Sequence, residues 1–299
     1  MLTGPIVVTG ATGFVGRHVV RALAAEGRKV VAVARPGRPV EAVEGPGVRV
    51  ARADLTDPAS LVEAARGAVA MVHLAAATDV SDEEVNRRLN VDGVRHVVEA
   101  CRAAGVRRLV AFSSHCAGRP LRDAYGRTKL EGEAVVRESG LAWTLFRPTM
   151  ICGPGSKEFE TFLALVRRLP VVPIIGPGTY RLRPCALEDV VPVVGRCLDR
   201  EGTVRQTYEL AGAEPLTMRE FIGLTAGLMG KWRPVVSIPA WLVLPAVRLL
   251  GAVMTHTPLA VDQVMAFLQD TVADLGPARR DLDFRPRPLR EALAWIGRG

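Results

Sequence analysis

The stretch Ile6-Val7-Val8-Thr9-Gly10-Ala11-Thr12-Gly13-Phe14-Val15-Gly16 decides the fold of this chain. Its first residues are mostly apolar and β-branched, which is typical of a buried strand. After the glycines, Val15, Val19, Val20 and Leu23 recur at helical spacing. A strand, a glycine loop and a helix that starts within one turn form an anion site, because the first N–H groups of the helix are unpaired and its dipole favours negative charge.

The three glycines of this stretch have separate roles in a dinucleotide-binding loop. Gly10 permits a tight turn, Gly13 lets the backbone approach a pyrophosphate, and Gly16 lets the helix pack against the strand. A purely structural glycine turn is the alternative, but the strand before the loop and the helix after it favour a cofactor site. The sequence therefore predicts that the cofactor contacts Gly10, Thr12, Gly13, Phe14, Val15 and Gly16.

The composition limits the class of protein. The chain has 299 residues, of which 48% are hydrophobic, enough for one large α/β domain or for a large and a small one. The first strand begins by Ile6 and leaves no room for a signal peptide, so we expect a cytoplasmic protein. The cysteines are scattered, without a C-x-x-C pair or a histidine cluster, so we expect reduced thiols and no metal site. They are Cys101, Cys116, Cys152, Cys185 and Cys197.

The net charge of +8 raises the question of nucleic acid as a partner. The arginines are spread along the chain, and the 4 Trp, 3 Tyr and 8 Phe residues are too few for a base-stacking platform. We therefore expect no nucleic-acid partner. A solvated basic surface, part of which faces an anionic cofactor, explains the charge better.

The end of the second expected strand, Lys29 to Ala34, indicates which cofactor is used. In dinucleotide folds an acidic residue at this position holds the 2′-hydroxyl of the adenosine ribose, whereas arginine accommodates a 2′-phosphate. Here Ala34 stands where an acid is wanted, and Arg35 and Arg38 follow. The alternative is that both arginines are ordinary surface residues. The pattern favours NADP(H) over NAD(H).

Strands and helices alternate through the first half of the chain. Further strands are expected at 48–53, 70–74, 108–112 and 142–146, with helical patterns at 59–66 and 82–104 between them. This alternation predicts an α/β fold with a Rossmann-type doubly wound parallel sheet. The regular alternation of strands and helices changes near residue 150. We therefore expect a cofactor-binding domain over 1–150 and a small, mostly helical substrate lobe over 151–299, intertwined with the first.

Several residues follow expected strands, at the sheet edge where ligands of parallel sheets bind. Asp54 could accept from an adenine amino group, or it could simply cap its turn. Ala75 and Ala76 are small enough for the backbone to lie against a ligand. His73, inside an apolar strand, is expected to be a packed core residue rather than a catalytic base.

Ser114, Tyr125 and Lys129 form a set suited to carbonyl–alcohol hydride chemistry. Ser114 ends a strand, and Tyr125 and Lys129 are four apart, on one face of an expected helix. Free tyrosine, with a pKa of about 10, is a poor base. A nearby ammonium and the positive nicotinamide of an oxidised cofactor are expected to lower that pKa. Ser114 would hold the reacting oxygen, and Lys129 the nicotinamide ribose.

The chain resembles the short-chain dehydrogenase/reductase superfamily, in its extended and atypical branches. The matching motifs, in the family's order, are Thr9 to Gly16, Asp54-Leu55, His73-Leu74-Ala75-Ala76, Asn90-Val91-Asp92-Gly93, Ser113-Ser114, Tyr125 to Lys129, and Arg147-Pro148 followed by Gly153-Pro154-Gly155. The resemblance implies catalytic roles for Ser114, Tyr125 and Lys129. It also implies cofactor contacts, including the adenine contact of Asp54, at Asp54, Leu55, Leu74, Ala75, Ala76, Tyr125, Lys129 and Pro148.

Two departures argue against the sugar-nucleotide members of that superfamily. Ala117-Gly118-Arg119 stands where those members carry V-Y-G, and the gap of 11 residues from Ser114 to Tyr125 is short. The short gap, the arginine after the second strand and the apolar tail look more like the atypical branch. That branch includes the NADPH-binding accessory subunit of respiratory complex I.

Three functions remain open from the sequence. The first is an NADP-dependent oxidoreductase that interconverts a hydroxyl and a carbonyl on a small, apolar substrate. The others are an epimerase or dehydratase of a sugar nucleotide, and a non-catalytic NADPH-binding structural or sensor protein. The apolar segment 241–254 is too short to span a bilayer. It is expected to be a core helix, a lid or a peripheral membrane contact, in a monomer or homodimer.

Overall fold

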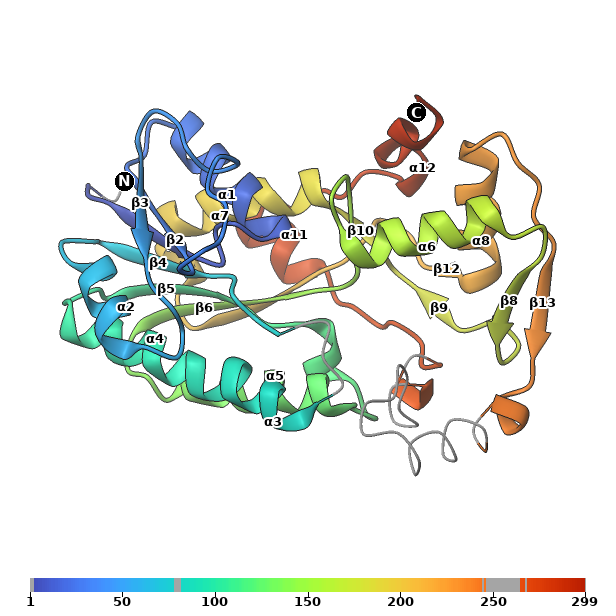
Figure 1. Ribbon diagram of the computed structural model, residues 1–299, viewed down its shortest axis with the longest axis horizontal. Helices are drawn as coiled ribbons and strands as arrows, with labels where there is room; N and C mark the ends of the chain where they lie inside the picture. The colour runs from blue at the N-terminus through green and yellow to red at the C-terminus, as the bar shows by residue number, and fades with distance from the viewer. Residues whose placement is uncertain (1–2, 78–81, 244, 246–263, 267, 299) are drawn as a thin grey trace.

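The computed structural model describes residues 3–77, 82–243, 245, 264–266 and 268–298. Figure 1 shows a sheet flanked by helices at the end that holds the N-terminus, and a smaller lobe at the other end. Of the apolar segment 241–254, residue 244 and residues 246–254 lie outside the described residues, so the expected roles of that segment stay untested. Within the described part of the chain, no helix is long and apolar enough to cross a membrane.

The larger part is built on one seven-stranded sheet in which every pair of neighbours is parallel. The strand order is β11-β6-β5-β4-β1-β2-β3, and the chain reverses its direction of winding at β1. The strands are β1 (Ile6–Thr9), β2 (Val30–Ala34), β3 (Val48–Arg52), β4 (Ala70–His73), β5 (Arg108–Phe112), β6 (Ala142–Pro148) and β11 (Gln206–Leu210). The predicted Rossmann-type sheet is confirmed.

Helices cover both faces of this sheet because its central strands are buried on both sides. β1, β2, β4 and β5 are buried at every position, as continuous apolar runs predict. In Figure 1 one helical layer lies above the sheet and one below. The upper layer holds α1 (Phe14–Ala25), α7 (Leu187–Asp199) and α11 (Gly276–Leu282), and the lower layer holds α2 (Pro58–Ala65), α3 (Glu83–Arg87), α4 (Gly93–Ala103) and α5 (Ala124–Arg137).

The helical pattern at 82–104 is not one continuous helix. α3 passes into a π-helical turn, η1 (Arg88–Asp92), and then into α4. At this turn the backbone carbonyl of Asn90 lies so close to α5 that a Cβ on Gly132 would overlap it. Single π-turns inside helices are frequent at functional sites. Here the widened turn lets Asn90 reach the loop that follows β4.

The smaller lobe has its own apolar core, which aromatic side chains from α6 and α8 fill. Phe162 and Phe221 stack with ring centroids 4.8 Å apart. The elements of this lobe are mostly helical or short: α6 (Lys157–Arg168), β8 (Val172–Ile175), β9 (Arg181–Leu182), β12 (Leu216–Thr217), α8 (Met218–Leu228), β13 (Val235–Ile238), α12 (Leu289–Ala292) and η4 (Ala294–Arg298). β8 pairs in parallel with β13.

The chain passes between the two parts several times. The short pair β7 (Ile151–Cys152) and β10 (Cys185–Ala186) leads into α7, and β11 then adds the last strand of the large sheet. α7 lies outside the helices expected from the sequence and has Pro192 in its interior. Buried residues of α7 and α11 nevertheless belong to the same apolar core as β1 and α1. The second half of the chain therefore completes the sheet as well as forming the lobe.

Candidate active site

The glycine loop between β1 and α1 has the shape that a dinucleotide requires. Gly10 has φ +70°, and a Cβ there would lie 2.6 Å from the backbone nitrogen of Ala75. A Cβ on Gly16 would overlap the carbonyl oxygen of Gly10. Both glycines are thus fixed by close approach of backbone to backbone. Gly13 caps α1 without any side-chain hydrogen bond, so the first N–H groups of the helix have no side-chain acceptor from the cap.

The remaining loop residues surround this helix end. Thr12, Phe14 and Val15 are half-buried. Arg17, which the sequence analysis missed, lies above Phe14 with its guanidinium carbon 5.9 Å from the ring centre. Its Nη2 donates to the carbonyl of Pro154 at 3.2 Å. The Gly153–Gly155 turn therefore lies beside the first turn of α1, where a pyrophosphate would bind.

The two arginines predicted to select the cofactor follow β2 and are exposed. Arg35 and Arg38 lie in one turn, in which the Arg38 N–H donates to the carbonyl of Arg35 at 3.1 Å. Arg52, at the end of β3, was not predicted. Its Nη1 donates to the carbonyls of Arg38 at 2.7 Å and Arg35 at 3.2 Å. Three arginines thus lie at one corner of the sheet, and no ion pair joins them to an acid among the described residues.

Asp54 and Leu55 lie at the carboxyl end of β3. The Asp54 carboxylate accepts from the N–H of Thr56 at 2.9 Å and from the Thr56 hydroxyl at 2.8 Å. The hydrogen bond from the Thr56 N–H, with the charges of Arg35 and Arg88, holds the pKa of Asp54 below its usual value. Asp54 therefore caps its turn, and both bonds from Thr56 go to the same carboxylate oxygen. The contact of Asp54 with adenine stays a prediction. Leu55 is buried and packs beneath α4.

The segment after β4 passes directly beside the glycine loop. Leu74, Ala75 and Ala76 are half-buried, and the Leu74 N–H donates to the carbonyl of Thr9 at 3.1 Å. His73 is buried within β4, and its Nδ1 lies 2.7 Å from the Thr9 hydroxyl. Burial lowers the pKa of His73 to about 3, with a smaller effect from the charge of Lys129. The prediction that His73 is a packed core histidine is confirmed.

Asn90 braces the same segment, a role that the sequence motif alone did not reveal. Its side chain accepts from the N–H of Ala77 at 3.0 Å and donates to the carbonyl of Ala77 at 3.2 Å. It also donates to the hydroxyl of Thr128 on α5 at 3.3 Å. The π-turn thereby ties the segment after β4 to the helix that carries the tyrosine and lysine.

Ser114 and Tyr125 meet at the carboxyl edge of the sheet. Ser114 begins the short helix η2 (His115–Gly118), and its Oγ accepts from the N–H of Cys116 at 3.2 Å. The side chain of Asp123 caps α5 by accepting from the N–H of Gly126 at 2.8 Å, and Tyr125 lies in the first turn of that helix. A Cβ on Gly126, the residue after Tyr125, would lie 2.9 Å from the carbonyl oxygen of Cys116 in η2, and the Ser114 side chain acts to lower the pKa of Tyr125. The start of α5, which carries Tyr125, thus packs against the turn that carries Ser114.

Lys129 is placed one turn further along α5. Its ammonium is buried and donates to the carbonyl of Phe112 at 2.7 Å. Burial lowers the pKa of Lys129 to about 8, against an opposing effect of Glu133. Burial also raises the pKa of Tyr125, which Ser114 only partly offsets. The expectation that the lysine lowers the tyrosine pKa is thus not met by the protein's own groups.

A buried ion-pair network, which no sequence motif indicated, supports this helix face. Glu133, one turn after Lys129, accepts from Nε and Nη2 of Arg147 at 2.7 Å each. Arg137 lies 2.9 Å from the same carboxylate. The doubly bonded arginine holds the pKa of Glu133 below its usual value despite burial. This pair fixes α5 against the end of β6, where Pro148 is half-buried.

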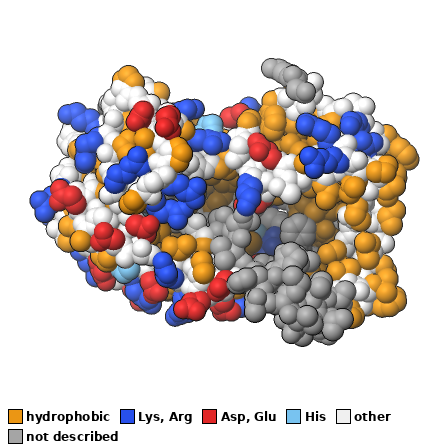
Figure 2. All heavy atoms as spheres, in the orientation of Figure 1, with side chains coloured by type: hydrophobic (Ala, Val, Ile, Leu, Met, Phe, Trp, Pro, Cys, Tyr) orange, Lys and Arg blue, Asp and Glu red, His pale blue; other side chains and the backbone are white. Residues whose placement is uncertain are grey.

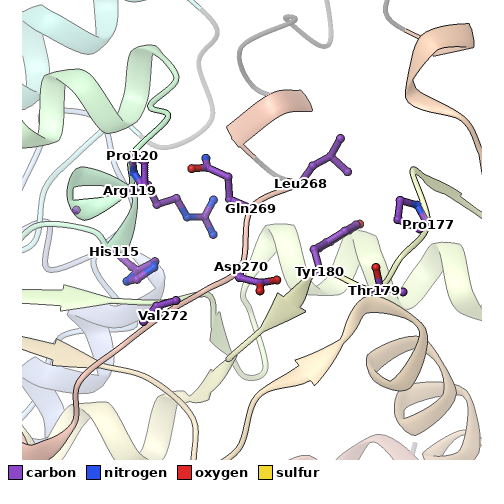
Figure 3. Close-up of a pocket in the computed structure, with 11 residues that line it drawn as sticks. His115, Arg119, Pro120, Pro177, Thr179, Tyr180, Leu268, Gln269, Asp270 and Val272 are labelled. Atoms are coloured by element: carbon purple, nitrogen blue, oxygen red, sulfur yellow. The ribbon is translucent and has the colours of Figure 1, made fainter.

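A cavity of about 690 Å³ opens between the turn that follows Ser114 and the smaller lobe. Figure 3 shows His115 and Arg119 entering from the side of η2, and Pro177, Thr179 and Tyr180 from the lobe. Segment 268–272 forms a third wall. Nη1 of Arg119 donates to the carbonyl of Ala266 at 2.8 Å, whereas its buried Nε has no partner among the described residues. The cavity thus combines apolar walls with a cation.

Comparison with known proteins identifies the family. Residues 10–161 match the NAD(P)H-binding family model. Ceramide reductase of Caulobacter vibrioides is 33% identical over 79% of this chain and 81% of its own. 3beta-Hydroxysteroid-dehydrogenase/decarboxylase isoform 2 of Arabidopsis thaliana is 29% identical over 96% of this chain and 60% of its own.

Similarity to a solved structure extends over nearly the whole chain. MoeE5 in complex with UDP-glucuronic acid and NAD superposes with a TM-score of 0.76, is 27% identical, and covers 97% of each chain. The family match, the reductase and dehydrogenase relatives and the parallel sheet agree on an NAD(P)-dependent oxidoreductase. The chain belongs to the NAD(P)H-binding family and is an enzyme of the extended, epimerase/dehydratase-like branch of the short-chain dehydrogenases/reductases.

Proposed function

We propose that this enzyme interconverts a hydroxyl and a carbonyl on a small, largely apolar substrate, with NADP(H) as cofactor. The observation that carries the proposal is that two hydroxyl side chains, Ser114 and Tyr125, lie on elements that pack together, with the Lys129 ammonium one helical turn further along. Lys129 bonds to the carbonyl of Phe112, two residues before Ser114, and His115, next to Ser114, lines the cavity. Ketone reduction needs a proton donor at the reacting oxygen, and these hydroxyls are the groups placed to serve it.

The chemistry divides among three side chains. NADP(H), when bound, would supply or accept the hydride at the substrate carbon. The Tyr125 hydroxyl gives its proton to the oxygen that becomes an alcohol, and takes it back in the reverse direction. Ser114 holds that oxygen by a hydrogen bond. Lys129 uses one of its three N–H donors on Phe112 and keeps two for ribose hydroxyls.

The raised pKa of Tyr125 favours the direction of reduction. Because desolvation raises its pKa, the phenol keeps its proton at neutral pH and is ready to donate it. In the oxidative direction the positive ring of the oxidised cofactor would lower the pKa and favour the phenolate. We therefore infer that reduction is the faster direction near pH 7.

Selection of NADP(H) over NAD(H) rests on the corner formed by Arg35, Arg38 and Arg52. The bonds from Arg52 fix the backbone of the turn, which leaves the other two guanidinium groups exposed beside the place of a ribose 2′-phosphate. Ala34 offers no carboxylate to hold the 2′-hydroxyl of NAD(H).

The cavity supports an apolar substrate with a polar end. Leu268, Val272 and Pro177 supply apolar wall, while His115 and Arg119 lie on the side nearest Ser114. The names of the ceramide and hydroxysteroid relatives point to largely apolar substrates as well. A carbonyl compound with a long hydrocarbon or ring portion fits this distribution.

The experiment is turnover of an aldehyde and ketone panel by the purified enzyme, followed by loss of NADPH absorbance. We expect apolar ketones to be reduced, NADPH to be used in preference to NADH, and Tyr125→Phe to abolish the signal. The similarity to MoeE5, whose structure holds a UDP-sugar, supports an epimerase or dehydratase as the second candidate. Such an enzyme would convert UDP-sugars without net loss of NADPH, and that result would replace the proposal.

A further inference from the structure

An apolar surface lies at the end of the smaller lobe, where β8 and β13 run side by side. Trp232 is 81% exposed, Trp241 69% and Val236 52%. We call this surface the lobe-end patch, and it consists of Val171, Trp232, Val236, Trp241 and Leu242. Figure 2 shows hydrophobic side chains gathered at the end of the molecule that holds β8 and β13 in Figure 1.

The patch is unusual because large apolar side chains cluster there. Single exposed hydrophobic residues are common on soluble proteins, but clustered ones mark interaction sites. Tryptophan combines an apolar ring with a polar N–H, which suits the boundary between water and an apolar phase.

The strands under the patch are held firmly, so the surface is preformed. Nε of Arg233 donates to the carbonyl of Val166 at 2.9 Å, which ties the start of β13 to α6. Arg219 on α8 bonds to the carbonyl of Val235 at 3.2 Å and to the hydroxyl of Ser237. The surface is therefore already ordered, and binding of a partner does not carry the free-energy cost of ordering it.

The charge around the patch is of one sign. Residues 161–187 and 221–261, which include both strands, contain no aspartate or glutamate. Arg167, Arg168 and Lys231 are exposed at its border, and none forms an ion pair with an acid in the described ranges. Figure 2 shows lysine and arginine side chains next to the apolar area. An anionic partner would complement this border.

We propose that the lobe-end patch docks on the anionic surface of a lipid bilayer. Exposed tryptophans and valines would enter the boundary between headgroups and acyl chains, while the three basic side chains would contact lipid phosphates and acidic headgroups. This occupant fits both the apolar centre and the basic border. A second copy of the chain fits only the centre, because a two-fold interface would bring the two basic borders against each other.

The inference is independent of the proposed reaction and needs no turnover to test. The intact protein is mixed with vesicles of phosphatidylcholine alone or with 30% phosphatidylglycerol, and the bound fraction is measured by flotation. We expect binding at least about tenfold stronger to the anionic vesicles, weaker in high salt, with a blue shift of tryptophan fluorescence.

Paired variants separate the two parts of the patch. Trp232→Ser with Val236→Ser removes apolar contact, and Arg167→Glu with Arg168→Glu reverses the charge; each pair should reduce binding about tenfold or more. Leu121→Ser and Arg49→Glu change exposed residues outside the patch and should leave binding unchanged. Circular dichroism of every variant confirms that the fold is retained.

Two results would overturn the inference. One is equal binding to neutral and anionic vesicles, or none to either, by a correctly folded protein. The other is sedimentation as a dimer that Trp232→Ser with Val236→Ser converts to a monomer, which would assign the patch to a second copy of the chain.

Discussion

The surroundings of Tyr125 determine how readily its hydroxyl gives up a proton. Burial makes its phenol a weaker acid than free tyrosine, while the Ser114 side chain opposes that effect. Lys129 is held by the carbonyl of Phe112 and carries a pKa of about 8, so its charge is itself sensitive to pH. The site therefore begins as a protonated acid, with a buried cation one helical turn further along α5, an arrangement suited to reduction.

Replacing Tyr125 with phenylalanine tests the catalytic assignment. The ring and its packing are kept, whereas the proton donor is lost, so we expect NADPH affinity to hold and turnover to fall ~10²–10⁴-fold. The measurement is activity per NADPH-saturated molecule. Tyr208→Phe, which removes a hydroxyl bonded to Asp281 away from the site, is the matched control and should retain activity. Full activity of Tyr125→Phe would rule out the Ser-Tyr-Lys assignment.

Replacing Arg35 with aspartate tests cofactor choice. We expect the unaltered enzyme to bind NADPH at least tenfold tighter than NADH, which corresponds to about 1.4 kcal/mol. The carboxylate would repel a 2′-phosphate and could accept from the 2′-hydroxyl, so the preference should vanish or invert. Arg49→Asp, on the same edge strand as Arg52, controls for a general change in charge. Equal affinities of the unaltered enzyme, by fluorescence titration, would refute the prediction.

His73 gives a prediction about acid stability. Its pKa is about 3 in the folded protein and about 6.5 when unfolded, so between these values the unfolded chain binds more protons. Stability therefore rises with pH through this window and is lost as pH falls below 6.5. His73→Asn can keep the bond to Thr9 without the titration. We expect it to reduce the loss of unfolding free energy between pH 6.5 and 4.5 by about 2 kcal/mol, measured by urea unfolding. The same loss of unfolding free energy over this pH range in His73→Asn and in the unaltered protein would contradict this prediction.

At the scale of elements, close backbone approach determines where the cofactor loop and the catalytic helix lie. α1 touches the end of β1 because Gly16 lacks a Cβ, and α5 touches the π-turn because Gly132 lacks one. The sequence marked Gly16 by its spacing. It gave no signal for Gly132, because the partner carbonyl belongs to an irregular turn that a helical pattern does not reveal.

Gly16→Ala should show how closely α1 must approach. The added methyl group would overlap the Gly10 carbonyl, so the helix must shift. We expect a loss of stability of about 1–3 kcal/mol and a clear loss of NADPH affinity. Gly223→Ala, in the middle of α8 with open space around the position, should instead be neutral or stabilise by up to ~1 kcal/mol. Unaltered cofactor affinity in Gly16→Ala would contradict the role given to this contact.

At the scale of the whole molecule, the two halves of the chain share one core. α7 and α11 cover the face of the sheet on which α1 lies, and β11 protects β6 from being an edge strand. The same second half also builds the lobe that closes the cavity and carries the lobe-end patch.

The fragment 1–150 should therefore fail to fold alone. Without β11 and α7 it exposes the edge of β6 and the apolar side of α1, which favours aggregation. We expect the intact chain to unfold in one cooperative transition by circular dichroism and the fragment to show none. A soluble fragment with a cooperative transition and NADPH affinity would mean that the domain expected over 1–150 is autonomous.

The sequence by itself determined the order of strands and helices in the first half, the glycine loop and the family, because periodicity and spacing are local properties. It also named Ser114, Tyr125 and Lys129. Only the tertiary structure decided what surrounds them: Arg52 behind the cofactor turn, Asn90 in its π-turn, the Glu133–Arg147 pair, and α7 with β11 on the first domain's sheet. These contacts join residues far apart in the chain. Their energies depend on burial and on the distance between atoms, which no local pattern encodes.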